Sequence, residues 1–184
     1  PRDITTGSSW ANAAIPGGPT ISADGSTIYA GKPVAKIAVD QRSTSETSIN
    51  PTHLSDLKLS PDGRLLLVSS YFQLEAFDTT TLNSVGVVPN ADFGGETAFL
   101  NNRYFVVGSS GNPQNRGGGI SLVDAQNFGA VQRITLDLAD NLAVSNRGEL
   151  FVASGTIDPA AGIHLGIAVY RLTGGQLQLH ETYF

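Results

Sequence analysis

An internal repeat is the feature that most constrains the fold of this 184-residue chain. The clearest unit begins at residues 57–70, LKLSPDGRLLLVSS, where an alternating strand, a Pro-Asp-Gly turn and an apolar run of strand length follow one another. Residues 74–78 and 84–89 then predict a third and a fourth strand. Since a small four-stranded unit buries its faces by stacking on its neighbours, the repeat predicts a stacked all-β array with little or no helix.

The same order of strands and turns recurs along the chain at regular spacing. Asp24 and Asp62 lie 38 residues apart, Phe77 and Val123 lie 46 apart, and Val123 and Tyr170 lie 47 apart. We therefore predict a single domain over residues 1–184 with four units. Their approximate boundaries are 15–53, 54–92, 93–138 and 139–184.

Four strands in about 40–45 residues are typical of a β-propeller blade. Residues 57–89, LKLSPDGRLLLVSSYFQLEAFDTTTLNSVGVVP, resemble the bacterial YVTN/lactonase-type propeller repeat. The resemblance runs from about Thr20 to Leu179 and implies the fold more than a function, because propellers host many activities. Two features depart from repeat patterns: the only Trp, Trp10, lies outside the units, and Asn101-Asn102 replaces the Asp-Gly turn.

The number of units leaves two architectures open. Complete lactonase-like propellers usually have more blades than the four found here, as the resemblance implies. The chain is therefore either a closed small propeller or a part of a larger one. It contains no Met and begins at Pro1, which favours a processed chain or a fragment.

Composition excludes several classes of function. Without Cys the chain has no disulfides, thiolate zinc sites, iron–sulfur clusters or Cys nucleophiles. With 11 Lys and Arg against 16 Asp and Glu, a nucleic-acid partner is not expected. No apolar stretch is long enough to predict a membrane span. The lack of Cys and the low Lys content favour an extracytoplasmic (secreted or periplasmic) location.

Polar residues recur where the innermost strand of each unit begins. Asp56, Glu96 and Asn141 hold this place, with His53 just before Asp56 and Asp92 just before Glu96. Carboxylates that converge on a central channel could bind Ca²⁺ or orient a water molecule. The alternative is that these side chains bind channel water or cap strand ends.

Two insertions between the second and third strands are further candidates for binding. Residues 108–119 contain Asn112 and Arg116, and residues 154–166 contain Asp158 and His164. Both insertions should lie on the same face of the array, where loops on a rigid scaffold often carry binding sites. The alternative is that they are plain surface loops.

The sequence contains no recognisable catalytic constellation. It has no Gly-x-Ser-x-Gly elbow, and His53, His164 and His180 are not expected to converge on a metal. We therefore predict a non-catalytic binding or interaction module without a cofactor, whose partner is a protein or the rest of a larger propeller. The alternative is a propeller enzyme, lactonase-like or dehydrogenase-like, that uses Asp56 and Glu96 with a bound cation such as Ca²⁺.

Overall fold

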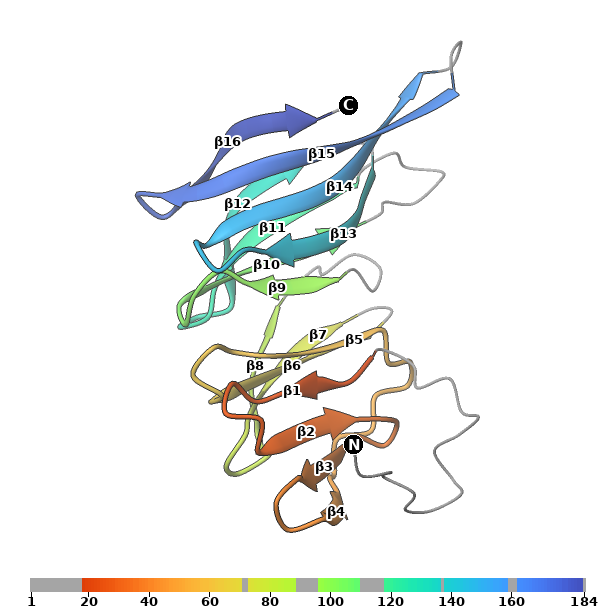
Figure 1. Cartoon of the computed structure of the whole chain (residues 1–184), viewed down its shortest axis with the longest axis vertical. Coiled ribbons are helices and arrows are strands. Elements are labelled where there is room, and N and C mark those ends of the chain that lie inside the picture. The colour runs from red at the N-terminus through yellow and green to blue at the C-terminus, as the bar shows by residue number, and fades with distance from the viewer. Residues whose placement is uncertain are drawn as a thin grey trace.

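The computed structural model describes residues 18–70, 73–88, 96–109, 118–136, 138–158 and 162–183. Within these ranges the chain forms four separate four-stranded antiparallel sheets and no helix (Figure 1). The strands of each sheet follow one another in chain order, so neighbouring strands form hairpins. The fold is therefore the all-β, propeller-type array of four blades that the repeat predicts.

The four blades are made of consecutive strands. Blade 1 contains β1 (Thr20–Ile21), β2 (Thr27–Ala30), β3 (Ala35–Ala38) and β4 (Ser43–Glu46). Blade 2 contains β5 (Asp56–Leu59), β6 (Leu65–Ser69), β7 (Leu74–Asp78) and β8 (Ser84–Val88). Blade 3 contains β9 (Thr97–Phe99), β10 (Tyr104–Ser109), β11 (Gly119–Asp124) and β12 (Gly129–Thr135). Blade 4 contains β13 (Leu138–Val144), β14 (Glu149–Asp158), β15 (Gly162–Thr173) and β16 (Gln176–Tyr183).

The first hairpin of each blade has one recurring feature, a residue that we call the turn anchor. Its main-chain N–H donates to the carbonyl of the first residue of the second strand. The four turn anchors are Ser22, Ser60, Leu100 and Ser145, which donate to Thr27, Leu65, Tyr104 and Glu149. Because the turn anchor has the same place in every blade, counting from it gives equivalent positions in all four.

The turn of blade 2 shows how the Asp-Gly signal works. Gly63 has a φ of 72°, a conformation that favours glycine, and its N–H donates to the Ser60 carbonyl. The Ser60 hydroxyl donates to Asp62 Oδ1 over 2.7 Å, and this bond helps to lower the pKa of Asp62. In blade 1, hydrogen bonds from Ser22 and Ser26 lower the pKa of Asp24 to about 2. Both carboxylates therefore stay ionised and continue to accept these bonds in mildly acidic solution.

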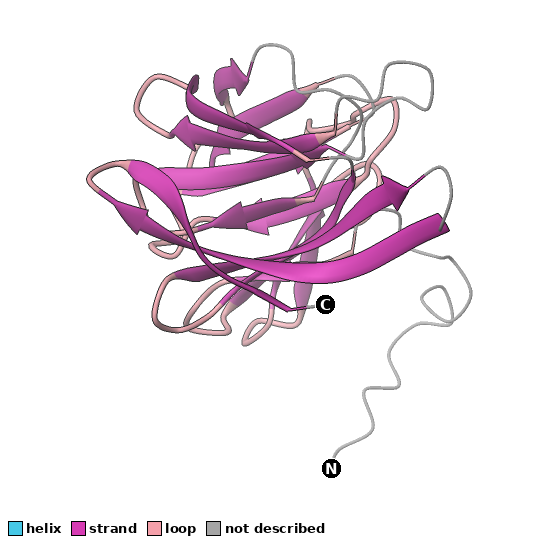
Figure 2. Cartoon of the chain, turned by 90° about the horizontal axis from the view of Figure 1, so that it is seen from above, coloured by secondary structure: helices cyan, strands magenta, loops and turns pink. Residues whose placement is uncertain are grey.

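The blades stack one on another, and their first strands lie side by side. Strand β1 lies against β5, β5 against β9, and β9 against β13. Figure 1 shows blade 1 at one end of the stack and blade 4 at the other, and Figure 2 looks along the stack. The blades do not close into a ring, which is consistent with part of a larger propeller and not with a closed four-bladed one.

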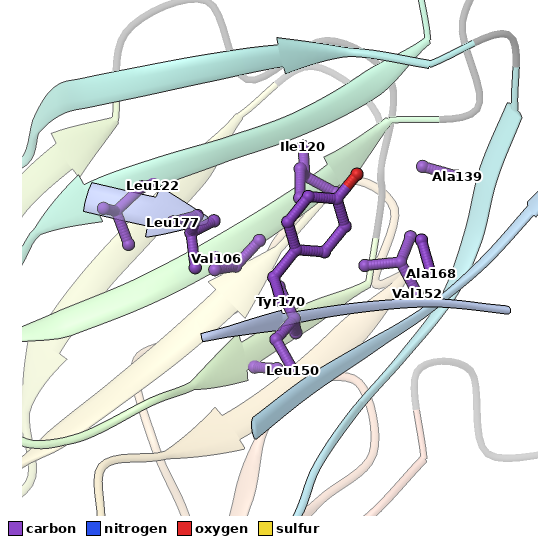
Figure 3. Close-up of a cluster of buried hydrophobic side chains, with 10 residues drawn as sticks. Val106, Ile120, Leu122, Ala139, Leu150, Val152, Ala168, Tyr170 and Leu177 are labelled. Carbon is purple, nitrogen blue, oxygen red and sulfur yellow. The ribbon is translucent and has the colours of Figure 1, made fainter. Parts of the chain in front are cut away.

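The hydrophobic core consists of three clusters, one between each pair of neighbouring blades. The cluster between blades 1 and 2 contains Tyr29, Val34, Ile49, Leu54, Leu57, Leu66 and Val68. The next contains Leu67, Leu74, Ala76, Val88, Phe105, Val107, Val123 and Phe128. The third, in which side chains of blades 3 and 4 gather around Tyr170 (Figure 3), contains Ala98, Val106, Ile120, Leu122, Ala139, Leu150, Val152, Ala168, Tyr170 and Leu177. Each interior blade thus contributes apolar side chains on both faces.

The second insertion differs from the loop that its length predicts. Residues 154–158 continue β14 and residues 162–166 begin β15, with paired positions from Ser154 and Gly166 to Asp158 and Gly162. The β-branched residues Ile157 and Ile163 pair with each other here, and such residues favour extended backbone. The insertion therefore lengthens a β-hairpin. Among the described residues there is no helix long and apolar enough to cross a membrane.

Candidate functional site

Asp56 begins β5 and links blade 2 to blade 3. Its buried carboxylate accepts hydrogen bonds at Oδ2 from the main-chain N–H and the hydroxyl of Thr97, both over 3.0 Å. Its Oδ1 accepts the N–H of Leu57 over 3.0 Å and lies 3.4 Å from Lys58 Nζ. Both oxygens are therefore engaged, and the main contacts cross from one inner strand to the next.

Glu96 makes the corresponding link between blades 3 and 4. It lies just before β9, and its Oε2 accepts the main-chain N–H of Leu142 in β13 over 2.8 Å. Thr97 and Leu142 each lie three residues before a turn anchor, so the two acidic side chains reach equivalent N–H groups. A hydrogen bond from a main-chain N–H to a carboxylate is charge-assisted and is therefore stronger than a hydrogen bond between neutral groups. We call this repeated contact the inter-blade latch.

Asn141 holds the third latch position. Asp56, Glu96 and Asn141 each lie four residues before the turn anchor of their blade. Asn141 is exposed, because no described blade follows blade 4. Among the described residues, its side chain accepts no hydrogen bond of the kind that Asp56 and Glu96 accept. The three polar residues thus hold equivalent places along the inner strands, and the side chains of Asp56 and Glu96 each reach the next blade.

The other two channel candidates are His53 and Asp92, which precede Asp56 and Glu96 in the sequence. His53 is exposed in the segment before β5, and Asp92 lies outside the described residues. Within the described part of the chain, no group of three or more His, Asp or Glu side chains is placed to hold a metal ion. The hydrogen bonds of Asp56 and Glu96 join each carboxylate to the inner strand of the next blade.

The insertion candidates contribute little to the described site. Asn112 and Arg116 lie outside the described residues. Asp158 ends β14 and His164 lies in β15, where it pairs with Thr156, but their side chains are not among those described. Both residues are therefore placed at the far end of the long β14–β15 hairpin by their backbone alone.

Sequence reasoning missed a second kind of contact between blades. Gln132 in β12 donates from Nε2 to the Leu177 carbonyl over 3.1 Å and accepts the Leu177 N–H at Oε1 over 2.7 Å. Between blades 2 and 3 the contact is different. The fourth-strand residue of blade 2 that is equivalent to Gln132 is Gly86, and the Phe128 ring of blade 3 packs over it. The equivalent fourth-strand residues of the other blades are Ser45, Gly86 and Glu181, so a comparison between repeats would not have singled out Gln132.

Comparisons with known proteins identify the fold but no family. No protein-family model and no curated protein matches the sequence. Among solved structures, the chain is similar to Kuenenia stuttgartiensis hydrazine synthase, with a TM-score of 0.73 and 14% identity over 88% of this chain and 52% of that one. It is also similar to the β-propeller domain of Myceliophteria thermophila Cps50 (Swd1), with a TM-score of 0.67 and 12% identity over 90% of this chain and 56% of that one. The chain therefore has a β-propeller scaffold and spans about half the length of these structures.

Proposed function

We propose that this chain is a non-catalytic protein-interaction module that serves as an open segment of a larger β-propeller. The observation that supports this function best is a sheet face of blade 4 on which the large apolar side chains of Ile167 and Tyr183 are exposed. We call this surface the open face. It contains Asn141, Ala143, Phe151, Ala153, Ile167, Glu181 and Tyr183, which strand register places on one side of the sheet, together with Val169, which is buried among them.

The open face corresponds to surfaces that are buried in the interior blades. The third strands of blades 2, 3 and 4 have an equivalent residue, which pairs with the same position of the second strand. These residues are Leu74, Ile120 and Ile167. Leu74 and Ile120 are each 1% exposed, whereas Ile167 is 45% exposed. The adjacent fourth-strand residue is 5% exposed in blade 2, where it is Val88, and 52% exposed in blade 4, where it is Tyr183. Large apolar side chains that are exposed at positions buried in the other blades are typical of an interaction site.

Removing one methyl group should distinguish the buried position from its exposed equivalent. Ile120→Val should lower the free energy of unfolding by about 0.5–1.5 kcal/mol, because it leaves a small cavity between blades 3 and 4. Ile167→Val should lower it by less than about 0.5 kcal/mol, because this side chain is already largely in water. Urea unfolding of both variants measures the difference. Equal losses would show that Ile167 is already packed in the isolated chain and would remove the basis of the proposal.

The alternative function, a cation-dependent enzyme at the channel carboxylates, has a direct test. Ca²⁺ takes about 6–8 oxygen ligands, whereas the Asp56 oxygens already accept hydrogen bonds from Thr97 and Leu57. We therefore expect millimolar Ca²⁺ to leave the melting temperature unchanged. Differential scanning calorimetry with and without Ca²⁺ measures this. A clear rise that disappears in the Glu96→Gln variant would favour the enzyme over the interaction module.

A further inference from the structure

The latch positions indicate what the open face binds, and this inference rests on the proposed function. Two consecutive blades each use an acceptor four residues before the turn anchor, Asp56 or Glu96. Each acceptor takes a main-chain N–H from the next inner strand, at Thr97 or Leu142. Asn141 presents an amide oxygen at the next place in this series, on the same face as Ile167 and Tyr183.

The partner that binds the open face must therefore resemble the side of a blade that donates a main-chain N–H to the inter-blade latch. It needs an apolar sheet face that covers Ile167 and Tyr183, as blade 3 covers Leu74 and Val88 in the cluster between blades 2 and 3. It also needs an inner strand with an unpaired N–H opposite Asn141. The established interfaces continue in the same direction along the stack, so the missing neighbour is another propeller blade.

The first blade of a second copy of this chain does not meet the second requirement. Three residues before its turn anchor, where the other blades have Leu57, Thr97 and Leu142, blade 1 has Pro19. Proline has no main-chain N–H to donate. A head-to-tail pair of chains would cover the apolar side chains but would leave the Asn141 oxygen without the donor that the latch uses.

We infer that the open face binds a propeller blade from a polypeptide segment other than this chain's first blade, and that Asn141 accepts a main-chain N–H from the inner strand of that blade. The partner is thus a four-stranded antiparallel sheet with an apolar face, which continues the array past blade 4. The expected contact repeats the Glu96–Leu142 geometry with a neutral acceptor in place of a carboxylate.

The probe for this inference is a blade whose receiving side the structure already shows. We would append a second copy of residues 136–184 to the full chain, so that blade 4 is followed by a copy of itself with the linker that normally precedes it. Blade 3 is not used, because its Phe128 ring packs over Gly86, whereas the residue of blade 4 equivalent to Gly86 is Glu181. The Leu142 N–H of the appended copy should then face Asn141 of the original blade 4. Hydrogen exchange by NMR should show protection of that amide, together with burial of Ile167 and Tyr183 seen in their side-chain signals.

Variants of this extended chain separate the two proposals. Asn141→Ala in the original blade 4 should lower the protection of the appended Leu142 amide by about fivefold, the effect of one ordinary hydrogen bond, without unfolding the appended sheet. Asn146→Ala, at an exposed position in the nearby turn, is the matched control and should change nothing. If the appended blade docks but Asn141→Ala has no effect, the latch is overturned and the interaction module stands. If the appended blade remains unprotected throughout, the proposed function fails as well.

The unmodified chain tests the choice of occupant. Analytical ultracentrifugation should show a monomer, because a second copy would bury the Asn141 amide opposite Pro19, which has no main-chain N–H to donate, and an unsatisfied buried polar group destabilises the contact. A stable dimer that Ile167→Asp dissociates would show that the open face binds a second copy and would overturn the inference.

Discussion

Replacing Phe105 by alanine should lower the free energy of unfolding by about 3–5 kcal/mol. Phe105 lies in β10 with none of its surface exposed, within the cluster that joins blades 2 and 3. Its ring centroid is 5.5 Å from that of Phe99 in the neighbouring strand. Loss of the ring removes both the apolar burial and this aromatic contact, and the surrounding strands can close only part of the cavity. Equilibrium unfolding in urea measures the change.

The matched control is Val131→Ala in β12 of the same blade. Val131 is 46% exposed, so its truncation should change the free energy of unfolding by less than about 0.5 kcal/mol. A loss below about 1.5 kcal/mol for Phe105→Ala would mean that blades 2 and 3 are not held together mainly by this cluster. It would contradict the picture of stacked blades with apolar contacts between each pair.

Much of the fold could be predicted because each strand carries a local signal. The alternation in residues 56–59, the Pro61-Asp62-Gly63 turn and the apolar run that follows correspond to β5, its turn and β6. Stacking then follows from repetition, since a blade with apolar residues on both faces needs neighbours. At residues 154–166 the length of the insertion predicts a loop, whereas Ile157 and Ile163 favour strand pairing and the structure has a hairpin there.

The candidate site was predictable in position but not in role. Equivalent places in the repeat bring Asp56, Glu96 and Asn141 to the inner strands, which the sequence alone indicates. Which groups these side chains contact depends on how one blade is offset against the next, and no local pattern encodes that offset. The same limit applies to Gln132, whose partner Leu177 lies 45 residues away in another blade.

Replacing Asp56 by alanine should lower the free energy of unfolding by about 2–4 kcal/mol. The substitution removes the acceptor of the Thr97 N–H, the Thr97 hydroxyl and the Leu57 N–H, all at a buried site between blades 2 and 3. Buried donors that lose their acceptor incur the cost of desolvation without a compensating bond. Asp40→Ala, at an exposed aspartate in blade 1, is the control and should have little effect.

A double-mutant cycle shows whether the loss of unfolding free energy in Asp56→Ala comes from the inter-blade latch. Thr97→Val removes the hydroxyl that donates to Asp56 Oδ2 and should by itself cost about 1 kcal/mol. In the Asp56→Ala background the same substitution should cost almost nothing, because the hydroxyl no longer has this acceptor. Additive losses would show that the hydroxyl of Thr97 does not couple blades 2 and 3 through Asp56. Coupling of about 1 kcal/mol would establish the carboxylate as a link between blades, the role that Asn141 offers to a following blade.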